Sequence, residues 1–272
     1  MSRPRPWLRG VAIAAAAVVA TLLLVALRFP WDRLAPAAES ALSEAAGHPV
    51  RIEGLGFGIG IAGPALEVRG VAIAWPDGRS VAFETIALRP AFSVDWLSGA
   101  PVLRIVAQGP MASFDGVAGP RRVEGRIVSR EVAALPWRGE PIVSGALEAT
   151  LDLAIDAGTV RGTATVSGRD GAIFPPNLPV VIPFDRVRAD FALEGDAIRV
   201  APLRLEGPMV SATATGIVVP GPGDPSRAQL DVAIEIRELD PVLGALVTSG
   251  GQALAPGRRL TLSGTLANPR IR

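Results

Sequence analysis

The sequence predicts a mainly β protein, in which a single N-terminal transmembrane helix is followed by a short helix and a largely antiparallel sheet. Three observations support this fold class. Residues Val11–Leu27 form an unbroken apolar run. From Pro49 onward, apolar and polar residues alternate with the period of two that is typical of half-buried strands. The 30 glycines and 25 prolines supply the turns that many short strands require.

The apolar run is long enough to anchor the chain in a membrane. Its seventeen residues would cover about 25 Å as a helix, and the flanking residues extend this toward the roughly 30 Å of a bilayer core. Arg3, Arg5 and Arg9 favour a cytoplasmic N-terminus. We therefore predict a tip and anchor over residues 1–31 and a domain across the membrane over 32–272. The predicted anchor residues are Val11, Ala14, Val18, Leu22, Leu24 and Leu27, and the predicted interfacial residues are Trp7, Arg9, Arg28 and Trp31.

A cleavable signal peptide is the alternative interpretation of this segment. Its apolar core usually has about 7–15 residues and ends at a small-x-small site. Here the core is longer, and residues 25–30 offer no clean site, although small residues recur at Ala35–Ala38. We favour the uncleaved anchor and keep cleavage as the alternative.

Composition excludes several classes of function. The 27 basic residues, all arginine, balance 26 acidic residues, so nothing indicates a nucleic-acid partner. Cysteine is absent, which excludes disulfides and thiolate metal sites. The single histidine, His48, has no nucleophile or carboxylate beside it in sequence and is interpreted as a solvated turn residue. We predict no enzyme, no cofactor and no metal.

Residues Gly58–Gly63 match the G-x-G-x-x-G pattern of nucleotide-binding loops. Such a loop needs a helix after it, whose N-terminus would meet the phosphates. Residues 64–69 instead alternate like a strand. We therefore interpret this stretch as a glycine-rich turn. Asp152 and Asp156 are likewise interpreted as ordinary outward-facing residues of a strand.

A short helix is predicted over Asp32–Ala46, with Asp32 as its cap and Gly47 as its end. Other short helical segments are predicted at 93–99 and 239–248, and 131–137 is either helical or irregular. Strands follow the period-two pattern. They are predicted at 50–53, 66–75, 81–88, 101–107, 122–128, 147–156, 160–167, 186–194, 203–206, 211–215, 230–237 and 260–266.

A short sequence motif in the first half of the domain recurs in the second half, and we call this recurrence the sequence echo. Gly109-Pro-Met follows one strand and Gly207-Pro-Met follows another. Either duplication of a β unit or chance explains this echo. The proline-rich connection Pro175–Pro183 is a plausible seam, so we predict two sub-units over 49–174 and 184–272.

The apolar faces of these strands have two possible arrangements. Two sheets can close on each other as a sandwich, or one sheet can curl into a trough with an apolar lining. The lining would be rich in Ala, Val and Leu, which suits acyl chains but equally suits a tight core. Large exposed apolar patches are rare, which favours the closed core.

Five short motifs, taken in order, resemble a known family. They are Phe29–Leu34, Gly47–Ile52, Trp75–Arg79, Leu205–Pro208 and Leu262–Pro269. With the single anchor, they resemble the type II secretion system protein N (GspN) family, which is similar to AsmA-like proteins. The resemblance covers nearly the whole chain, except for Gly116–Glu140.

The resemblance implies a curved AsmA-like sheet in the periplasm, held by a single pass through the bacterial inner membrane. It implies a non-enzymatic accessory component of a type II protein secretion system, whose partners are other secretion-system proteins. The AsmA-like relation implies an alternative, a periplasmic protein that binds or transfers phospholipid. No catalytic residues come with the family.

Overall fold

The computed structural model describes residues 28–60, 63–74, 80–91, 99–134, 143–156, 159–174, 180–220, 227–246, 248–249, 252–253, 256–265 and 268–271. The predicted anchor, the Trp75–Arg79 motif and nearly all of the helical segment predicted at 93–99 lie outside these ranges. Within the described ranges, no helix has both the length and the apolar character needed to cross a membrane.

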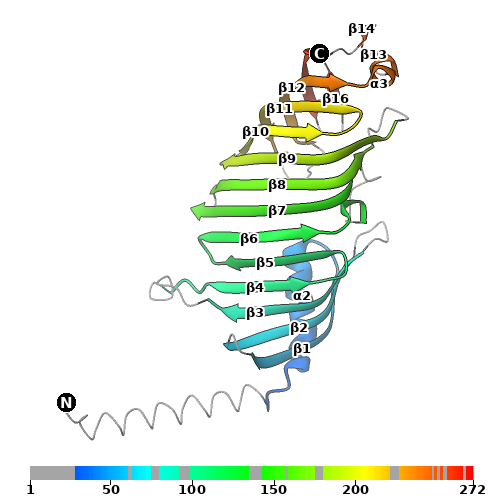
Figure 1. Ribbon diagram of the computed structural model, residues 1–272. Helices are drawn as coiled ribbons and strands as arrows, with labels where there is room; N and C mark the ends of the chain where they lie inside the picture. Colours follow the sequence, from blue (N-terminus) through cyan, green and yellow to red (C-terminus); the bar gives the residue numbers. More distant parts are fainter. Residues whose placement is uncertain are drawn as a thin grey trace, which may run out of the picture.

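One curved, open, antiparallel sheet makes up most of the described chain (Figure 1). Its fourteen strands follow one another in sequence order, so each pairs with its immediate predecessor and successor. The strands are β1 Val50–Gly60, β2 Gly63–Ala74, β3 Ser80–Pro90, β4 Leu103–Gln108, β5 Ala112–Ala118, β6 Arg122–Ser129, β7 Val143–Asp156, β8 Thr159–Ile173, β9 Ile182–Glu194, β10 Ala197–Glu206, β11 Val210–Val219, β12 Gln229–Leu239, β15 Arg259–Thr265 and β16 Asn268–Ile271. Two short strands, β13 Thr248–Ser249 and β14 Gln252–Ala253, pair separately.

The helical elements confirm most of the predictions made for them. The first consists of a 3-10 turn, η1 Trp31–Leu34, and a helix, α2 Ala35–Ala46. Pro36 falls in its first turn, where a missing N–H costs nothing, and Gly47 ends the helix at φ 67°. The helix at 239–248 is observed as α3 Pro241–Leu246, and 131–137 contains the short turn η3 Val132–Ala134.

The predicted cap is wrong. No side chain caps α2 at its N-terminus. The Asp32 carboxylate instead accepts a hydrogen bond of 3.0 Å from the backbone N–H of Leu55 in β1. The contact with a strand distant in sequence therefore replaces the local cap.

The sandwich is also wrong, because fourteen of the described strands form one continuous open sheet and only the short pair β13 and β14 lies outside it. Strand β5 is absent from the predictions. Its segment offers Phe114 and Val117 as its only large apolar residues, and they lie three positions apart, so they break the period of two. Strands β13, β14 and β16 are also absent from the predictions, and the other strands agree with the predicted positions, with longer bounds at most ends.

The described core is concentrated at the N-terminal end of the sheet. Buried residues of β1 and β2 form a cluster there: Val50, Ile52, Leu55, Val68 and Val71. Trp31, Ala35 and Ala38 of η1 and α2 pack against this cluster, together with side chains of β3. Apolar burial of this kind, rather than helix propensity, holds a short helix in place.

Irregularities curve the strands. In β2, Gly70 adopts φ +58°, a conformation that favours glycine, and Val68 and Val71 on either side of it join the same buried cluster. Register also shifts between Ser144 and Ala146 of β7, and between Val200 and Leu203 of β10. Such bulges bend a strand and increase its twist.

The two Gly-Pro-Met turns occupy equivalent positions in the sheet. The first joins β4 to β5, and the second joins β10 to β11. After β6, the backbone N–H of Arg130 donates to the carbonyl of Met111 at 2.9 Å; after β12, that of Asp240 donates to the carbonyl of Met209 at 2.8 Å. The sequence echo therefore marks a repeated structural unit.

A buried apolar residue follows each of these hydrogen bonds. Val132 in η3 is 3% exposed and Leu243 in α3 is 2% exposed. Each lies in the short helical turn that follows its strand. The repeat thus includes the packing after the strands as well as the turns.

Candidate functional site: the apolar face of an open sheet

On one face of the sheet, three adjacent rows carry only apolar side chains and glycine over ten consecutive strands. Residues directly opposite each other on neighbouring strands lie on the same face, so the register defines rows that cross the sheet. The central row, from β4 to β15, is Ile105, Gly116, Gly125, Leu151, Ala164, Phe191, Val200, Gly216, Val232 and Leu262.

The rows on either side have the same character. One runs Leu103, Ala118, Val123, Leu153, Gly162, Leu193, Ile198, Val218, Leu230 and Gly264. The other runs Ala107, Phe114, Ile127, Ala149, Val166 and Ala189 to the bulge in β10, and then continues as Leu203, Ala214, Ile234 and Leu260. We call these three rows the apolar face.

Most of the apolar face is only half-buried. Ala107 is 5% exposed, whereas Leu103 on the same strand is 37% exposed. Within the described chain, the helical segments in substantial contact with the sheet are η1 and α2 on β1, and η3 on β7. No second described sheet packs across the apolar face. Extensive apolar surface is therefore left without a described covering layer.

An aromatic ring fills a gap in the apolar face. Gly116 and Gly125 are direct cross-strand partners, and a Cβ built on either would collide with the ring of Phe114. The ring therefore lies against the bare backbone of both glycines. This arrangement shields backbone that glycine leaves open.

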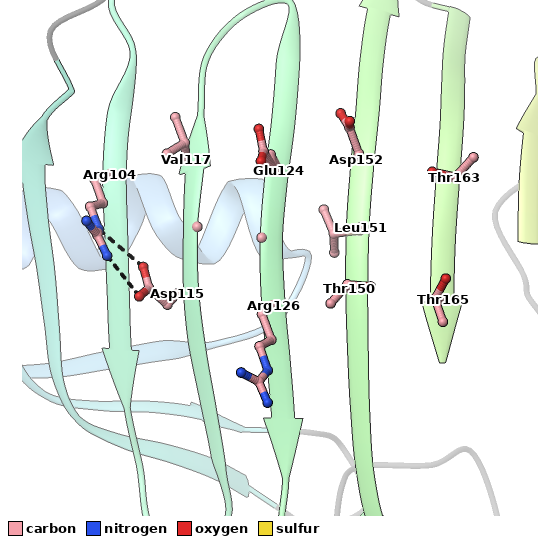
Figure 2. Close-up of a pocket in the computed structure, with 12 residues that line it drawn as sticks. Arg104, Asp115, Val117, Glu124, Arg126, Thr150, Leu151, Asp152, Thr163 and Thr165 are labelled. Carbon is pink, nitrogen blue, oxygen red and sulfur yellow. Dashed lines mark hydrogen bonds and ion pairs between the residues drawn. The ribbon is translucent and has the colours of Figure 1, made fainter. Parts of the chain in front are cut away.

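The opposite face carries charged residues paired across strands (Figure 2). Arg104 of β4 donates two hydrogen bonds, of 3.2 and 3.0 Å, to the Asp115 carboxylate of β5. Arg126 of β6 forms an ion pair of 2.8 Å with Glu148 of β7. These residues surround or adjoin an open hollow of about 490 Å³, which threonines of β7 and β8 also line.

These ion pairs further favour the charged form of arginines that are protonated at neutral pH in any case. A hydrogen bond from Arg104 to Asp115, and then the charge of Asp115, raise the pKa of the guanidinium above its ordinary value. Arg122 is affected in the same way by Asp152. The side chains are more than half exposed, 56% for Arg104 and 55% for Asp115, so each pair contributes little to stability. The hollow is therefore exposed to solvent, and the positive and negative charges of its side chains largely neutralise each other.

The described residues contain no group of three or more His, Cys, Asp or Glu side chains arranged to hold a metal. His48 is half-buried where α2 meets β1. Asp152 points to the charged face and pairs with Arg122 at 3.0 Å, as an outward-facing strand residue would. Gly58–Gly60 lie within β1 and Gly63 begins β2, so most of the stretch predicted as a glycine-rich turn is strand, and residues 61 and 62 lie outside the described residues. Residues 64–69 form a strand, as predicted, rather than the helix that a nucleotide-binding loop needs.

Two of the predicted membrane-proximal residues can be placed. Arg28 is exposed, and Trp31 stacks on Phe57 of β1 with ring centroids 5.9 Å apart. The other eight lie outside the described residues: Trp7, Arg9, Val11, Ala14, Val18, Leu22, Leu24 and Leu27. None of the predicted site residues belongs to the apolar face. The alternation of apolar and polar residues predicts which side chains share a face. Only the open topology of the sheet shows that the apolar face has no described covering layer.

Comparison with known proteins adds no relative. No family model matches the sequence, no curated protein matches it, and no solved structure matches its fold.

Proposed function

We propose that this protein holds the acyl chains of phospholipid against its apolar face, as a non-enzymatic periplasmic protein anchored in a bacterial inner membrane by residues 11–27. The observation that carries the proposal is the set of three cross-strand rows without a polar side chain. Monomeric soluble proteins rarely expose contiguous apolar patches beyond about 300–600 Å², and larger patches mark binding surfaces. Acyl chains are a suitable occupant because the lining is uncharged and, apart from Phe114 and Phe191, aliphatic or glycine.

The dimensions support this occupant. Adjacent strands lie about 4.8 Å apart, so the nine steps from β4 to β15 cover roughly 43 Å. Two opposed chains fill the roughly 30 Å core of a bilayer, or about 15 Å for each chain. The apolar face is therefore long enough for a whole acyl chain. Each square ångström of chain removed from water would contribute about 25 cal/mol.

Two neighbouring residues provide a matched test. Ile127 belongs to the apolar face, whereas Val128, the next residue of β6, lies on the charged face opposite Glu148. Both are half-buried. We expect Ile127→Glu to lower the amount of phospholipid that mass spectrometry detects on the purified full chain. A bound acyl chain would displace the hydrating water of the new carboxylate, and this desolvation costs free energy. Val128→Glu places a second carboxylate opposite Glu148 and should cost some stability, but it should leave the lipid content of the folded chain unchanged.

A photo-crosslinking residue at the same two positions would locate the lipid. Crosslinks to acyl chains are expected from position 127 and not from position 128. This readout separates lipid on the sheet from detergent or lipid around the anchor. Equal crosslinking at both positions, or equal lipid content in both glutamate variants, would overturn the proposal.

A second candidate is an accessory component of a type II secretion system, supported by the motifs from Phe29–Leu34 to Leu262–Pro269. Deletion of the gene should impair type II export or assembly of the apparatus. Complementation with Ile127→Glu then separates the two functions. Restored export by this variant would assign the secretion role to surfaces other than the apolar face, and unimpaired export after deletion would exclude the secretion role.

A further inference from the structure

A second hollow, of about 230 Å³, lies on the charged face of the C-terminal strands. Four of its residues form one row by register, since Thr213 lies opposite Arg204, Glu235 opposite Thr213, and Arg259 opposite Glu235. The row continues outside the hollow to Arg188, which lies opposite Arg204. The polar and charged lining consists of Arg204, Thr213, Thr215, Glu235, Arg237 and Arg259.

The charge of this hollow is unbalanced. It holds three guanidiniums and one carboxylate. Within the described chain, none of its three arginines forms an ion pair, although Arg104, Arg122, Arg126 and Arg199 on the same face are all paired. Like charges directly opposite on neighbouring strands, as in Arg188 and Arg204, destabilise a sheet; Asp190, 4.0 Å from Arg188, offsets part of this repulsion, whereas Arg204 has no such carboxylate among the described residues. An anion in the hollow would relieve that repulsion.

We propose that this hollow binds a phosphate group. A guanidinium presents a rigid fork of donors that matches phosphate geometry, and the hydroxyls of Thr213 and Thr215 add uncharged donors. Glu235, between Thr213 and Arg259 in register, is placed to accept a hydrogen bond from the P–OH group of a phosphate monoester or of inorganic phosphate, a group that a diester headgroup lacks. The group has two possible sources, a lipid headgroup or free phosphate. The site lies on the face opposite the acyl chains, so it is independent of the function proposed above.

Calorimetry tests the site on the full chain in a maltoside detergent, which carries no phosphate. One arm titrates inorganic phosphate, and the other titrates glycerophosphoglycerol, the deacylated diester headgroup of phosphatidylglycerol. Saturable binding of either probe is expected to weaken as salt is added. The probe that binds more tightly identifies the source.

The double variant Arg204→Gln, Arg259→Gln is expected to weaken binding by about tenfold or more, because it removes two charge-assisted contacts. Arg126→Gln is the matched control, since it removes one charge from an ion pair outside this hollow and should leave binding unchanged. Absence of binding by both probes would overturn the proposal. So would binding that the double variant retains, or that the control weakens equally.

Discussion

The Glu39 carboxylate of α2 accepts a hydrogen bond of 2.6 Å from the backbone N–H of Ile52 in β1. Ser43 accepts a similar bond of 2.8 Å from Val50, and Asp32 accepts one from Leu55. Strand β1 is an edge strand of the sheet. Its outer N–H groups would otherwise be free to pair with another chain, which is a common route to aggregation. The first helix thus covers a sheet edge as well as the core beneath it.

Glu39→Ala should therefore loosen the helix and expose the edge. We expect a loss of about 1 kcal/mol in the free energy of unfolding, faster amide exchange at Ile52, and more self-association. Chemical denaturation, hydrogen exchange and light scattering on the full chain measure these effects. Glu39→Gln retains a carbonyl acceptor and should behave nearly as the wild type. If Glu39→Ala exchanges no faster at Ile52, the edge-covering role is wrong.

Gly70 should not tolerate a side chain. Its φ of +58° is unfavourable for other residues, and an added Cβ would collide with the side chain of Glu53. Gly70→Ala is expected to lower the free energy of unfolding by about 1–3 kcal/mol. Gly56→Ala is the control, because a Cβ there would meet nothing within 4 Å and its φ is not positive. Equal stability of the two variants would contradict a strained backbone at Gly70.

Phe184 should be among the most important side chains of the C-terminal half. It is 4% exposed, and its ring lies against Gly171 and close to Gly168. Phe184→Ala should cost about 3–5 kcal/mol of unfolding free energy, as for other buried phenylalanines. Phe174→Ala removes the same atoms from a residue that is 37% exposed and should cost much less. Thermal denaturation of both variants measures the difference.

The local alternation of apolar and polar residues was sufficient to predict most strands. In β12, Leu230, Val232, Ile234 and Ile236 alternate with polar or small residues, and the observed strand spans Gln229–Leu239. Pattern failed at β5, where Phe114 belongs to the apolar face and Val117 lies opposite Arg104 on the other. Here glycine and alanine fill the alternate positions, so the period of two is not visible.

Long-range relationships were beyond the reach of local rules. Asp32 followed the pattern of a helix cap, yet it bonds to Leu55, twenty-three positions away. Whether the apolar faces meet each other or remain open depends on the path of the whole sheet. The unbalanced hollow likewise joins Arg204 and Arg259, which come together only once strand order and register are known.

The ion pair of Arg104 and Asp115 gives a prediction about surface charge. Arg104 also lies directly opposite Arg89 on β3, so Asp115→Asn would leave two arginines side by side without that carboxylate. Both partners of the pair are more than half exposed. We therefore expect a loss of at most about 1 kcal/mol at low ionic strength, measured by urea denaturation.

Salt and pH sharpen this test. In about 1 M salt the Debye length falls to roughly 3 Å, so the effect of Asp115→Asn should nearly vanish. Because Asp115 raises the pKa of Arg104, the stabilisation tied to that arginine is fully present below its unfolded value and does not change near neutral pH. The double variant Arg104→Gln, Asp115→Asn removes the repulsion and should be more stable than Asp115→Asn alone. A loss that persists at high salt, or in the double variant, would show that Asp115 acts through packing rather than through charge.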